Sequence, residues 1–227
     1  MKVLVNIPFL LNADQIMDQA HVEVGSDDAA DLRFLIALAQ KVGRPKAAYA
    51  PVFITGRDGD KIQIGDTSLT SRTLAHNLES VERVFPLVAT CGHEMDQGFP
   101  GKGDMLKDFW WDLIKSHLLG VANKHLSEHL HNEFRLGKTA TMHPGSGDAS
   151  IWPIEQQKAL FSLLDNVENE LGIHLTDSFL MVPNKTTSGL LFPTETDFRS
   201  CEVCHRESCR SRHAPFNKTL WEEIQHD

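Results

Sequence analysis

The sequence is poor in basic residues and has no long apolar run. Its 22 lysines and arginines are outnumbered by 31 aspartates and glutamates, which gives a net charge of −9 at pH 7. Nucleic-acid recognition needs a basic face, so this charge argues against a nucleic-acid partner and leaves small molecules and proteins. The apolar start MKVLVNIPFLLN soon meets charge, and no small-residue cleavage site follows. We therefore expect neither a signal peptide nor a transmembrane span, and a cytoplasmic location.

Internal repeats, low-complexity runs and linkers are also missing. The chain has 227 residues, of which 41% are hydrophobic and 23% charged, which is ordinary for a soluble globular protein with a real core. We expect a single domain over residues 1–227, and the sequence does not indicate an oligomeric state.

Local patterns predict helices and strands in an irregular order. Helices are predicted at 14–19, 29–42, 71–78, 105–136 (with a possible interruption at Gly120), 154–171 and 220–225. A hairpin is predicted from Val52 to Ile64, a strand over 83–92, and two short strands across a turn in FLMVPNKTTSGLLFP. This order predicts an α+β fold rather than a regular βαβ fold.

Cysteine is scarce and unevenly distributed. The chain has four cysteines, and Cys201, Cys204 and Cys209 lie within nine positions in the segment SCEVCHRESCRSRHAPF, residues 200–216. In a reducing compartment such clusters more often hold metal or do redox chemistry than form disulfides. The C-x2-C-x4-C spacing suits thiolate ligation, and the arginines between and after the cysteines would favour thiolates. We expect a metal site there, either zinc or an iron–sulfur cluster.

The fourth ligand of this metal site is left open by the sequence. Cys91 follows a predicted strand and would complete a four-cysteine set, but it could equally be a buried core residue. His205 or His213 could instead supply an imidazole, or the fourth position could be open.

A second metal pattern is weaker. His125, Glu128 and His129 match the H-x-x-E-H arrangement of inverted zinc peptidases, with both imidazoles on one helical face. In a chain with 12 histidines a five-residue match arises easily by chance. A solvated polar helix face is the better interpretation.

A glycine-rich loop is the next candidate site. Gly145 and Gly147 would let backbone come close to a ligand, and Asp148 could accept a hydrogen bond from an amine or hydroxyl. Without further information a plain turn, with Asp148 as a local cap, explains these residues as well.

The stretch from Thr141 to Pro193 resembles the reactivation domain of cobalamin-dependent methionine synthase and its free-standing relatives. That family carries an SPGYGD-like loop, a helix, and then the pattern G-x-x-L-T-x-S-x-x-M-x-P-x-x-S-x-S-G. The counterparts in this sequence are Pro144, Gly145, Ser146, Gly147, Asp148, Gly172, Leu175, Thr176, Ser178, Met181, Pro183, Thr187, Ser188 and Gly189. The resemblance is carried by about 50 residues.

The resemblance implies a single α+β domain with a twisted antiparallel sheet and flanking helices. It implies a domain that docks on a corrinoid protein and holds S-adenosylmethionine while inactive cob(II)alamin is reduced and remethylated. The 144–148 loop and a turn at 186–189, with Thr187, Ser188 and Gly189, would face that ligand and the corrin.

Two departures from the family pattern bear on this expectation. Thr141 stands where the family has an arginine suited to clamping a carboxylate, and Ser146 replaces a tyrosine. They leave S-adenosylmethionine binding in question, whereas the cysteine run is an addition suited to redox chemistry.

The leading expectation is therefore an accessory protein that docks on a cobalamin-dependent methyltransferase or corrinoid protein. It would support reductive reactivation of the cobalt with an iron–sulfur cluster. The alternatives are a non-catalytic corrinoid-protein-binding module with a structural zinc site, an S-adenosylmethionine-dependent reactivator, and, least favoured, a zinc peptidase.

Overall fold

The computed structural model describes residues 1–99, 101 and 103–226. The strands are β1 (Lys2–Leu4), β2 (Lys46–Tyr49), β3 (Val52–Phe53), β4 (Gly56–Asp58), β5 (Lys61–Ile64), β6 (Thr67–Thr70), β7 (Arg83–Thr90), β8 (Thr139–Met142), β9 (His174–Leu175), β10 (Met181–Val182) and β11 (Thr186–Pro193). The helices are α1 (Ala13–Gln19), α2 (Asp27–Val42), α3 (Arg72–Asn77), α4 (Glu94–Gln97), α5 (Met105–Phe134), α6 (Gln157–Ser162), α7 (Val167–Leu171) and α8 (Lys218–His226). Two 3₁₀ turns, η1 (Ile154–Gln156) and η2 (Ser200–Val203), complete the elements.

A central antiparallel sheet organises the molecule. Its strand order is β1-β2-β7-β11-β8, and β3 continues the pairing along β7. The middle strands β7 and β11 pair from Thr186 opposite Thr90 to Leu191 opposite Phe85. Small separate sheets are formed by β4-β5-β6 and by β9-β10. This arrangement confirms the predicted α+β class with an antiparallel sheet and flanking helices.

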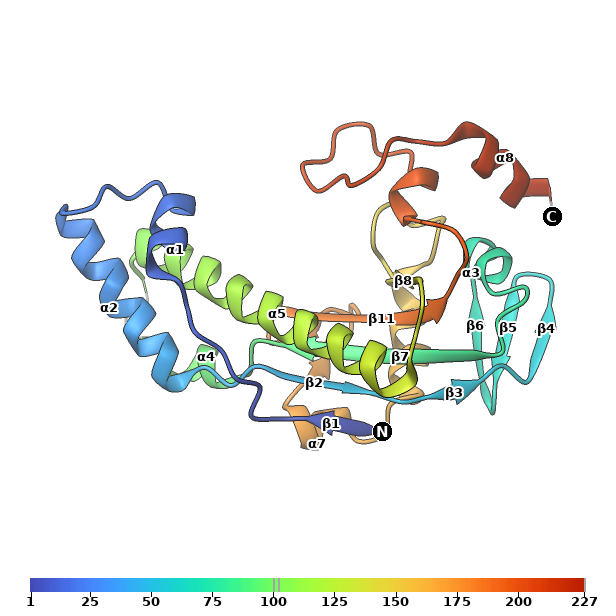
Figure 1. The fold of residues 1–227 in the computed structure, drawn as a ribbon, viewed down its shortest axis with the longest axis horizontal. Helices are drawn as coiled ribbons and strands as arrows, with labels where there is room; N and C mark the ends of the chain where they lie inside the picture. The colour runs from blue at the N-terminus through green and yellow to red at the C-terminus, as the bar shows by residue number, and fades with distance from the viewer. Residues whose placement is uncertain (100, 102, 227) are drawn as a thin grey trace.

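The long helix α5 covers one face of the central sheet (Figure 1). Its buried side chains Leu118, Ala122, Leu126 and Leu130 recur every four residues, so they form one apolar stripe. The last three pack on residues of β2 and β7, among them Phe85. The helix runs unbroken through Gly120, so the possible interruption there does not occur.

Helices α1, α2 and α4 pack with the first half of α5 around a second apolar cluster, at one end of the molecule (Figure 1). Ser26 is the N-cap of α2, since its side chain accepts a hydrogen bond from the N–H of Ala29. No helix in the described residues has the length and apolar character required to cross a membrane.

Two predicted elements differ in the structure. The predicted helix over 154–171 is divided into η1, α6 and α7, because Asn166 takes a left-handed conformation at φ +60° and interrupts the hydrogen bonding. The hairpin predicted from Val52 is shifted: β4 pairs with β5 across Gly59, whereas Val52 and Phe53 pair with β7.

Candidate functional site

The loop after β8 is a tight, closed turn. The N–H of Gly145 donates to the carbonyl of Trp152 at 2.8 Å, and the N–H of Ser146 donates to the carbonyl of His143 at 3.2 Å. Gly145 and Gly147 have φ of +74° and +81°, a region that favours glycine. A Cβ on Gly145 would lie 2.9 Å from the side chain of Ile154, and one on Gly147 3.2 Å from Cys204 Sγ. Both glycines are thus required by conformation and by close packing.

Asp148 ends the loop as the local cap that the plain-turn interpretation predicted. One carboxylate oxygen accepts from the Ser150 N–H at 3.0 Å and from the Ser150 hydroxyl at 2.9 Å. The other oxygen lies 3.6 Å from Nδ1 of His205. The Ser150 N–H, together with that hydroxyl, lowers the pKa of Asp148, so the carboxylate is ionised at neutral pH.

The loop borders an open groove of about 600 Å³. Its lining residues are Gly145, Gly147, Asp148, Ala149, Ile154, Glu155, His205 and Arg206. The glycine loop therefore meets the cysteine segment across this groove. Within the predicted set, the structure brings together Gly145, Gly147 and Asp148.

The second half of the predicted site, Thr187 to Gly189, is not a turn. These residues lie within β11, between β7 and β8, and are inside the sheet. The Thr187 hydroxyl donates to Asn123 of α5 at 2.8 Å, and the buried Ser188 hydroxyl accepts from the side-chain amide of Gln157. A Cβ on Gly189 would lie 2.7 Å from both His143 Nδ1 and the Met142 carbonyl. Their polar groups bond to side chains of the scaffold, and the prediction of a turn at 186–189 is wrong, because these residues form a strand.

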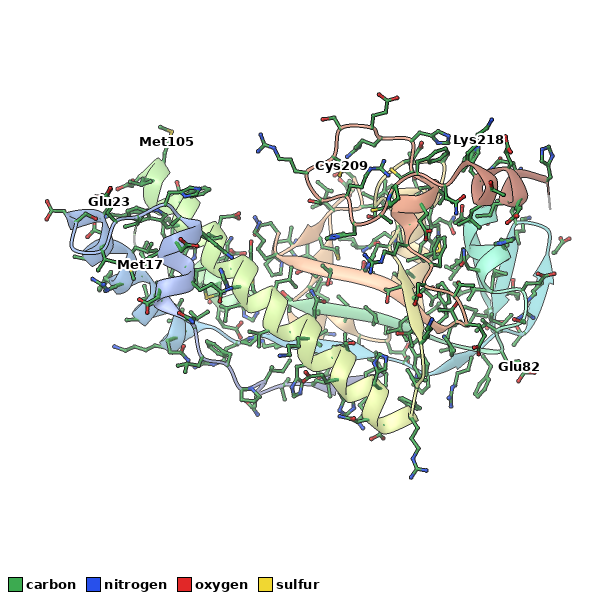
Figure 2. All side chains as sticks on the ribbon, turned by 45° about the horizontal axis from the view of Figure 1, so that its top comes forward. Met17, Glu23, Glu82, Met105, Cys209 and Lys218 are labelled. Atoms are coloured by element: carbon green, nitrogen blue, oxygen red, sulfur yellow. The ribbon has the colours of Figure 1, made fainter. Side chains whose placement is uncertain are left out.

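The cysteine segment is closed around one arginine. The guanidinium of Arg212 donates to the carbonyls of Cys201 at 2.8 Å, Cys204 at 2.9 Å, Arg206 at 2.6 Å and Ala214 at 3.1 Å. The N–H of His213 also lies 3.4 Å from Cys201 Sγ. Cys204 is buried against the glycine loop, and Cys209 is half-buried in the segment between η2 and α8 (Figure 2). One half-buried guanidinium group can therefore hold the whole segment in shape.

The donor set of this segment suits zinc or an iron–sulfur cluster, but its side chains are not gathered. Within residues 1–99, 101 and 103–226, no three His, Cys, Asp or Glu side chains are grouped so as to hold a metal ion. All four cysteines are free thiols. The structure thus does not assemble Cys201, Cys204 and Cys209 into one ligand set.

Cys91 lies in a different part of the molecule from the other three cysteines. It is fully buried in the cluster formed by α1, α2, α4 and α5, whereas Cys204 belongs to the cluster around Trp152. Burial raises the pKa of the Cys91 thiol to about 12, so it remains protonated. Cys91 therefore does not lie with the C-terminal cysteines as a fourth ligand. It is a buried core residue, which was the other interpretation offered by the sequence.

The residues of the H-x-x-E-H pattern make packing and surface contacts in α5. His129 Nε2 lies 3.0 Å from the hydroxyl of Tyr49 and their rings are in contact. Glu128 faces solvent beside Lys124. These contacts agree with a helix face that is part polar surface and part sheet contact.

The sequence interpretation did not identify two residues that line the groove, His205 and Arg206. His205 was considered only as a metal ligand, and Arg206 only as a charge beside the cysteines. Their position opposite the glycine loop depends on contacts of His205 with Phe216 and Trp221, at ring distances of 4.7 and 4.4 Å. No local pattern in the sequence reports such contacts.

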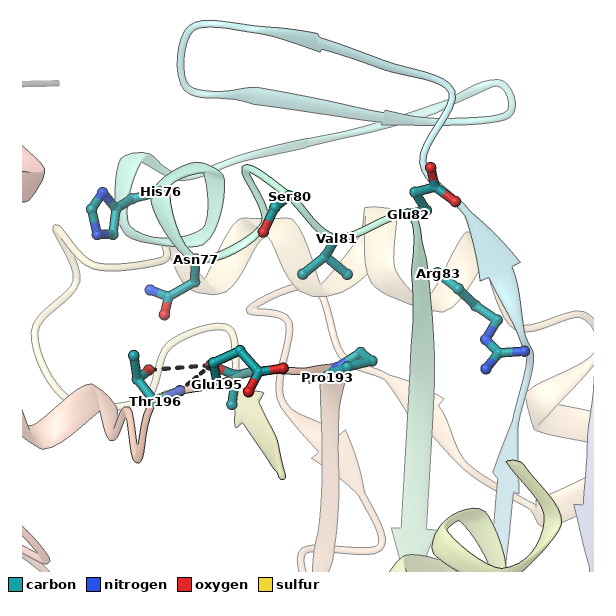
Figure 3. A pocket seen from close by; sticks show the side chains of 10 residues that line it. His76, Asn77, Ser80, Val81, Glu82, Arg83, Pro193, Glu195 and Thr196 are labelled. Carbon is teal, nitrogen blue, oxygen red and sulfur yellow. Dashed lines mark hydrogen bonds between the residues drawn. The ribbon is translucent and has the colours of Figure 1, made fainter. Parts of the chain in front are cut away.

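A second hollow, of about 550 Å³, lies between the end of α3 and the segment after β11 (Figure 3). It contains none of the residues singled out from the sequence. Arg83 at its rim lies over the rings of Phe85 and Phe134, so its charge is already engaged. The groove beside the glycine loop is therefore the candidate site.

Comparison with known proteins supports the same region. A family model described as "Vitamin B12 dependent methionine synthase, activation domain" matches residues 120–210, which include the glycine loop, β11 and the three C-terminal cysteines. A crystal structure of the MetH reactivation domain bound to AdoHcy matches with a TM-score of 0.60 and 19% identity. That match covers 84% of this chain and 72% of the other. No curated protein sequence matches the chain.

These findings confirm the resemblance stated from the sequence, and the fold is that of the methionine synthase activation domain. The matched segment extends beyond the roughly 50 residues that carried the resemblance. It begins inside α5 and ends at Arg210. Neither comparison identifies the cysteine run as a metal site.

Proposed function

We propose that this chain supports reductive reactivation of a corrinoid protein, binding S-adenosylmethionine in the groove beside the glycine loop. The observation that carries the proposal is the position of this groove. It is bordered by Gly145, Gly147 and Asp148, the loop that the family pattern specifies, in a chain with the activation-domain fold.

The proposed chemistry has two balanced steps on the partner's cobalamin. One electron from an external donor reduces cob(II)alamin to cob(I)alamin. The cobalt of cob(I)alamin then attacks the sulfonium methyl group, the S–CH₃ bond breaks, and methylcobalamin and neutral S-adenosylhomocysteine are formed. In these two steps this chain would hold the sulfonium ligand and dock on the corrinoid protein, and its cysteine segment would pass on the electron.

The departures at Thr141 and Ser146 do not remove the case for this ligand. Thr141 lies in β8 opposite Leu191, and Ser146 is exposed at the tip of the loop. The similar MetH domain is described as bound to AdoHcy, the demethylated product of the same ligand. The net charge of −9 favours a protein partner over nucleic acid.

The first test is titration of the full chain with S-adenosylmethionine and S-adenosylhomocysteine by calorimetry. Gly147→Val should abolish binding, because its side chain would enter the groove next to Cys204. Gly65→Val is the matched control, since Gly65 also has a positive φ, +55°, with nothing within 4 Å. Absence of binding by the wild-type chain would overturn the proposed ligand.

The second test uses a methionine synthase cobalamin domain loaded with cob(II)alamin, a chemical one-electron reductant and S-adenosylmethionine. Addition of this chain should accelerate conversion of the cob(II)alamin spectrum to that of methylcobalamin. An unchanged rate at saturating chain concentration would overturn the reactivation role.

For the electron supply we propose that Cys201, Cys204 and Cys209 hold an iron–sulfur cluster, with structural zinc as the alternative. The three thiols are free, lie in one closed segment, and one already accepts a backbone N–H, which favours a thiolate. Ligation requires the three side chains to turn toward one another.

Metal and acid-labile sulfide analysis of anaerobically purified protein separates the alternatives. Iron with sulfide and a broad visible absorbance, lost in Cys209→Ser but retained in Cys91→Ser, would support the cluster. Stoichiometric zinc would support a structural clip, and absence of both metals would remove the metal proposal.

A further inference from the structure

Acidic and basic side chains line opposite sides of the groove. Asp148 and Glu155 contribute carboxylates on the side of the glycine loop and η1, and His205 and Arg206 come from the cysteine segment. Ile154 and the glycine backbone lie between them. A site with an acidic side, a basic side and an apolar part suits a zwitterion attached to an apolar body.

His205 sets the position of the basic side. Its ring contacts Phe216 and Trp221, with the Trp221 ring nearly perpendicular at 87°, and its Nδ1 faces Asp148 at 3.6 Å. The next residue, Arg206, has its carbonyl held by Arg212. The backbone at Arg206 is thus held by the ring contacts of His205 before it and by the hydrogen bond from Arg212 to its own carbonyl.

The three arginines of the segment have different surroundings. Arg212 is committed to four carbonyl groups. Arg206 is exposed and lines the groove, and in the described part of the chain its guanidinium forms no hydrogen bond or ion pair. Arg210 is exposed and is not among the groove residues. Of these three arginines, only Arg206 both lines the groove and has a guanidinium group whose N–H donors are not already bonded within the described residues.

We infer that Arg206 binds the carboxylate of the groove's ligand, so that the cysteine segment supplies half of the ligand site. The ligand class is a molecule with an α-amino acid group, whose carboxylate meets Arg206 and whose ammonium group meets the Asp148 side. This inference rests on the proposed function of the same groove. Arginine suits the task because its guanidinium pairs with a carboxylate in bidentate fashion.

The test compares S-adenosylhomocysteine with 5′-methylthioadenosine, which lacks the amino acid group, on the full chain. Arg206→Ala should weaken S-adenosylhomocysteine binding at least 10-fold and leave methylthioadenosine binding unchanged. Arg206→Lys should recover part of the loss, since it keeps the charge without the fork. Arg210→Ala is the matched control and should bind both ligands like the wild type.

Each other outcome has a definite meaning. Wild-type binding of S-adenosylhomocysteine that Arg206→Ala does not weaken would overturn the role of Arg206 and leave the proposed function standing. An equal loss for both ligands would assign Arg206 a structural role and overturn the inference. A wild-type chain that binds neither ligand overturns the proposed function and this inference with it.

Discussion

The glycine loop at 144–148 and the strand segment at 187–189 belong to one sequence pattern but differ in structure. Gly145, Ser146 and Gly147 are exposed beside a groove. Ser188 and Gly189 are buried in the centre of the sheet, and the Ser188 hydroxyl is bonded to the side-chain amide of Gln157. The loop can meet a ligand, whereas the strand holds the loop in place.

The two segments are joined through His143. Its Nδ1 lies 2.7 Å from the carbonyl of Ser188, and the loop begins at the following residue. Gly189 leaves the space that allows this approach. Residues shared by a pattern can thus divide into those that contact a ligand and those that support them, and substitutions should separate the two kinds.

The largest effect is expected for Gly189→Val. Its Cβ would lie 2.7 Å from His143 Nδ1 and from the Met142 carbonyl, in a strand that is paired with β7 on one side and β8 on the other. We expect a loss of about 3 kcal/mol or more in the free energy of unfolding, measured by urea denaturation.

Gly147→Ala in the loop is the comparison for this substitution. The strain of a positive φ should cost about 1–2 kcal/mol, and the nearest side-chain atom, Cys204 Sγ, lies 3.2 Å away. Equal losses at the two glycines would contradict the distinction between loop and scaffold.

Next in size is Ser188→Ala. It would leave the buried amide of Gln157 without its acceptor, so we expect a loss of about 1–3 kcal/mol in thermal or urea unfolding. Ser146→Ala, at an exposed position, should stay within about 0.5 kcal/mol of the wild type. A larger loss at Ser146 than at Ser188 would reverse the assignment.

The same contrast explains what the sequence could predict. The glycines at 145 and 147 predict a loop, because a positive φ favours glycine and φ is a property of the residue itself. The run Thr187-Ser188-Gly189 also looks like a turn, and its strand conformation follows from partners far away in the sequence. Asn123 and Gln157 satisfy its hydroxyls, and no local signal reveals either contact.

The cysteines teach a related lesson. The spacing placed Cys201, Cys204 and Cys209 in one local segment, but it could not report that Cys91 packs in another core cluster. Nor could it show that the residues between the cysteines, His205 and Arg206, border the groove. Proximity between distant segments depends on tertiary packing, which periodicity and spacing do not encode.

A smaller, pH-dependent effect is expected for His143. Burial lowers the pKa of its imidazole, so the folded state favours the neutral ring. The unfolded state binds a proton below about pH 6.5, and stability from this group is therefore present above that pH and lost as the pH falls. Each unit of pKa depression corresponds to about 1.4 kcal/mol. Urea unfolding at pH 7.5 and 5 should show a steeper decline for the wild type than for His143→Gln, and parallel declines would contradict this assignment.

The smallest effect is expected for Asp148→Asn. The amide oxygen can accept the same two bonds from Ser150, so unfolding at pH 7 should change by about 0.5 kcal/mol or less. The pKa of Asp148 is lowered, chiefly by the Ser150 N–H, so any contribution of its charge is present above about pH 4 and is lost as the pH falls further. Urea unfolding from pH 7 to pH 3 should therefore show the two proteins converging. A loss at pH 7 as large as that of Ser188→Ala would mean that the loop is held as rigidly by Asp148 as the sheet is by Ser188. In that case the loop would be scaffold too, and the groove would have to bind its ligand without any change in the loop.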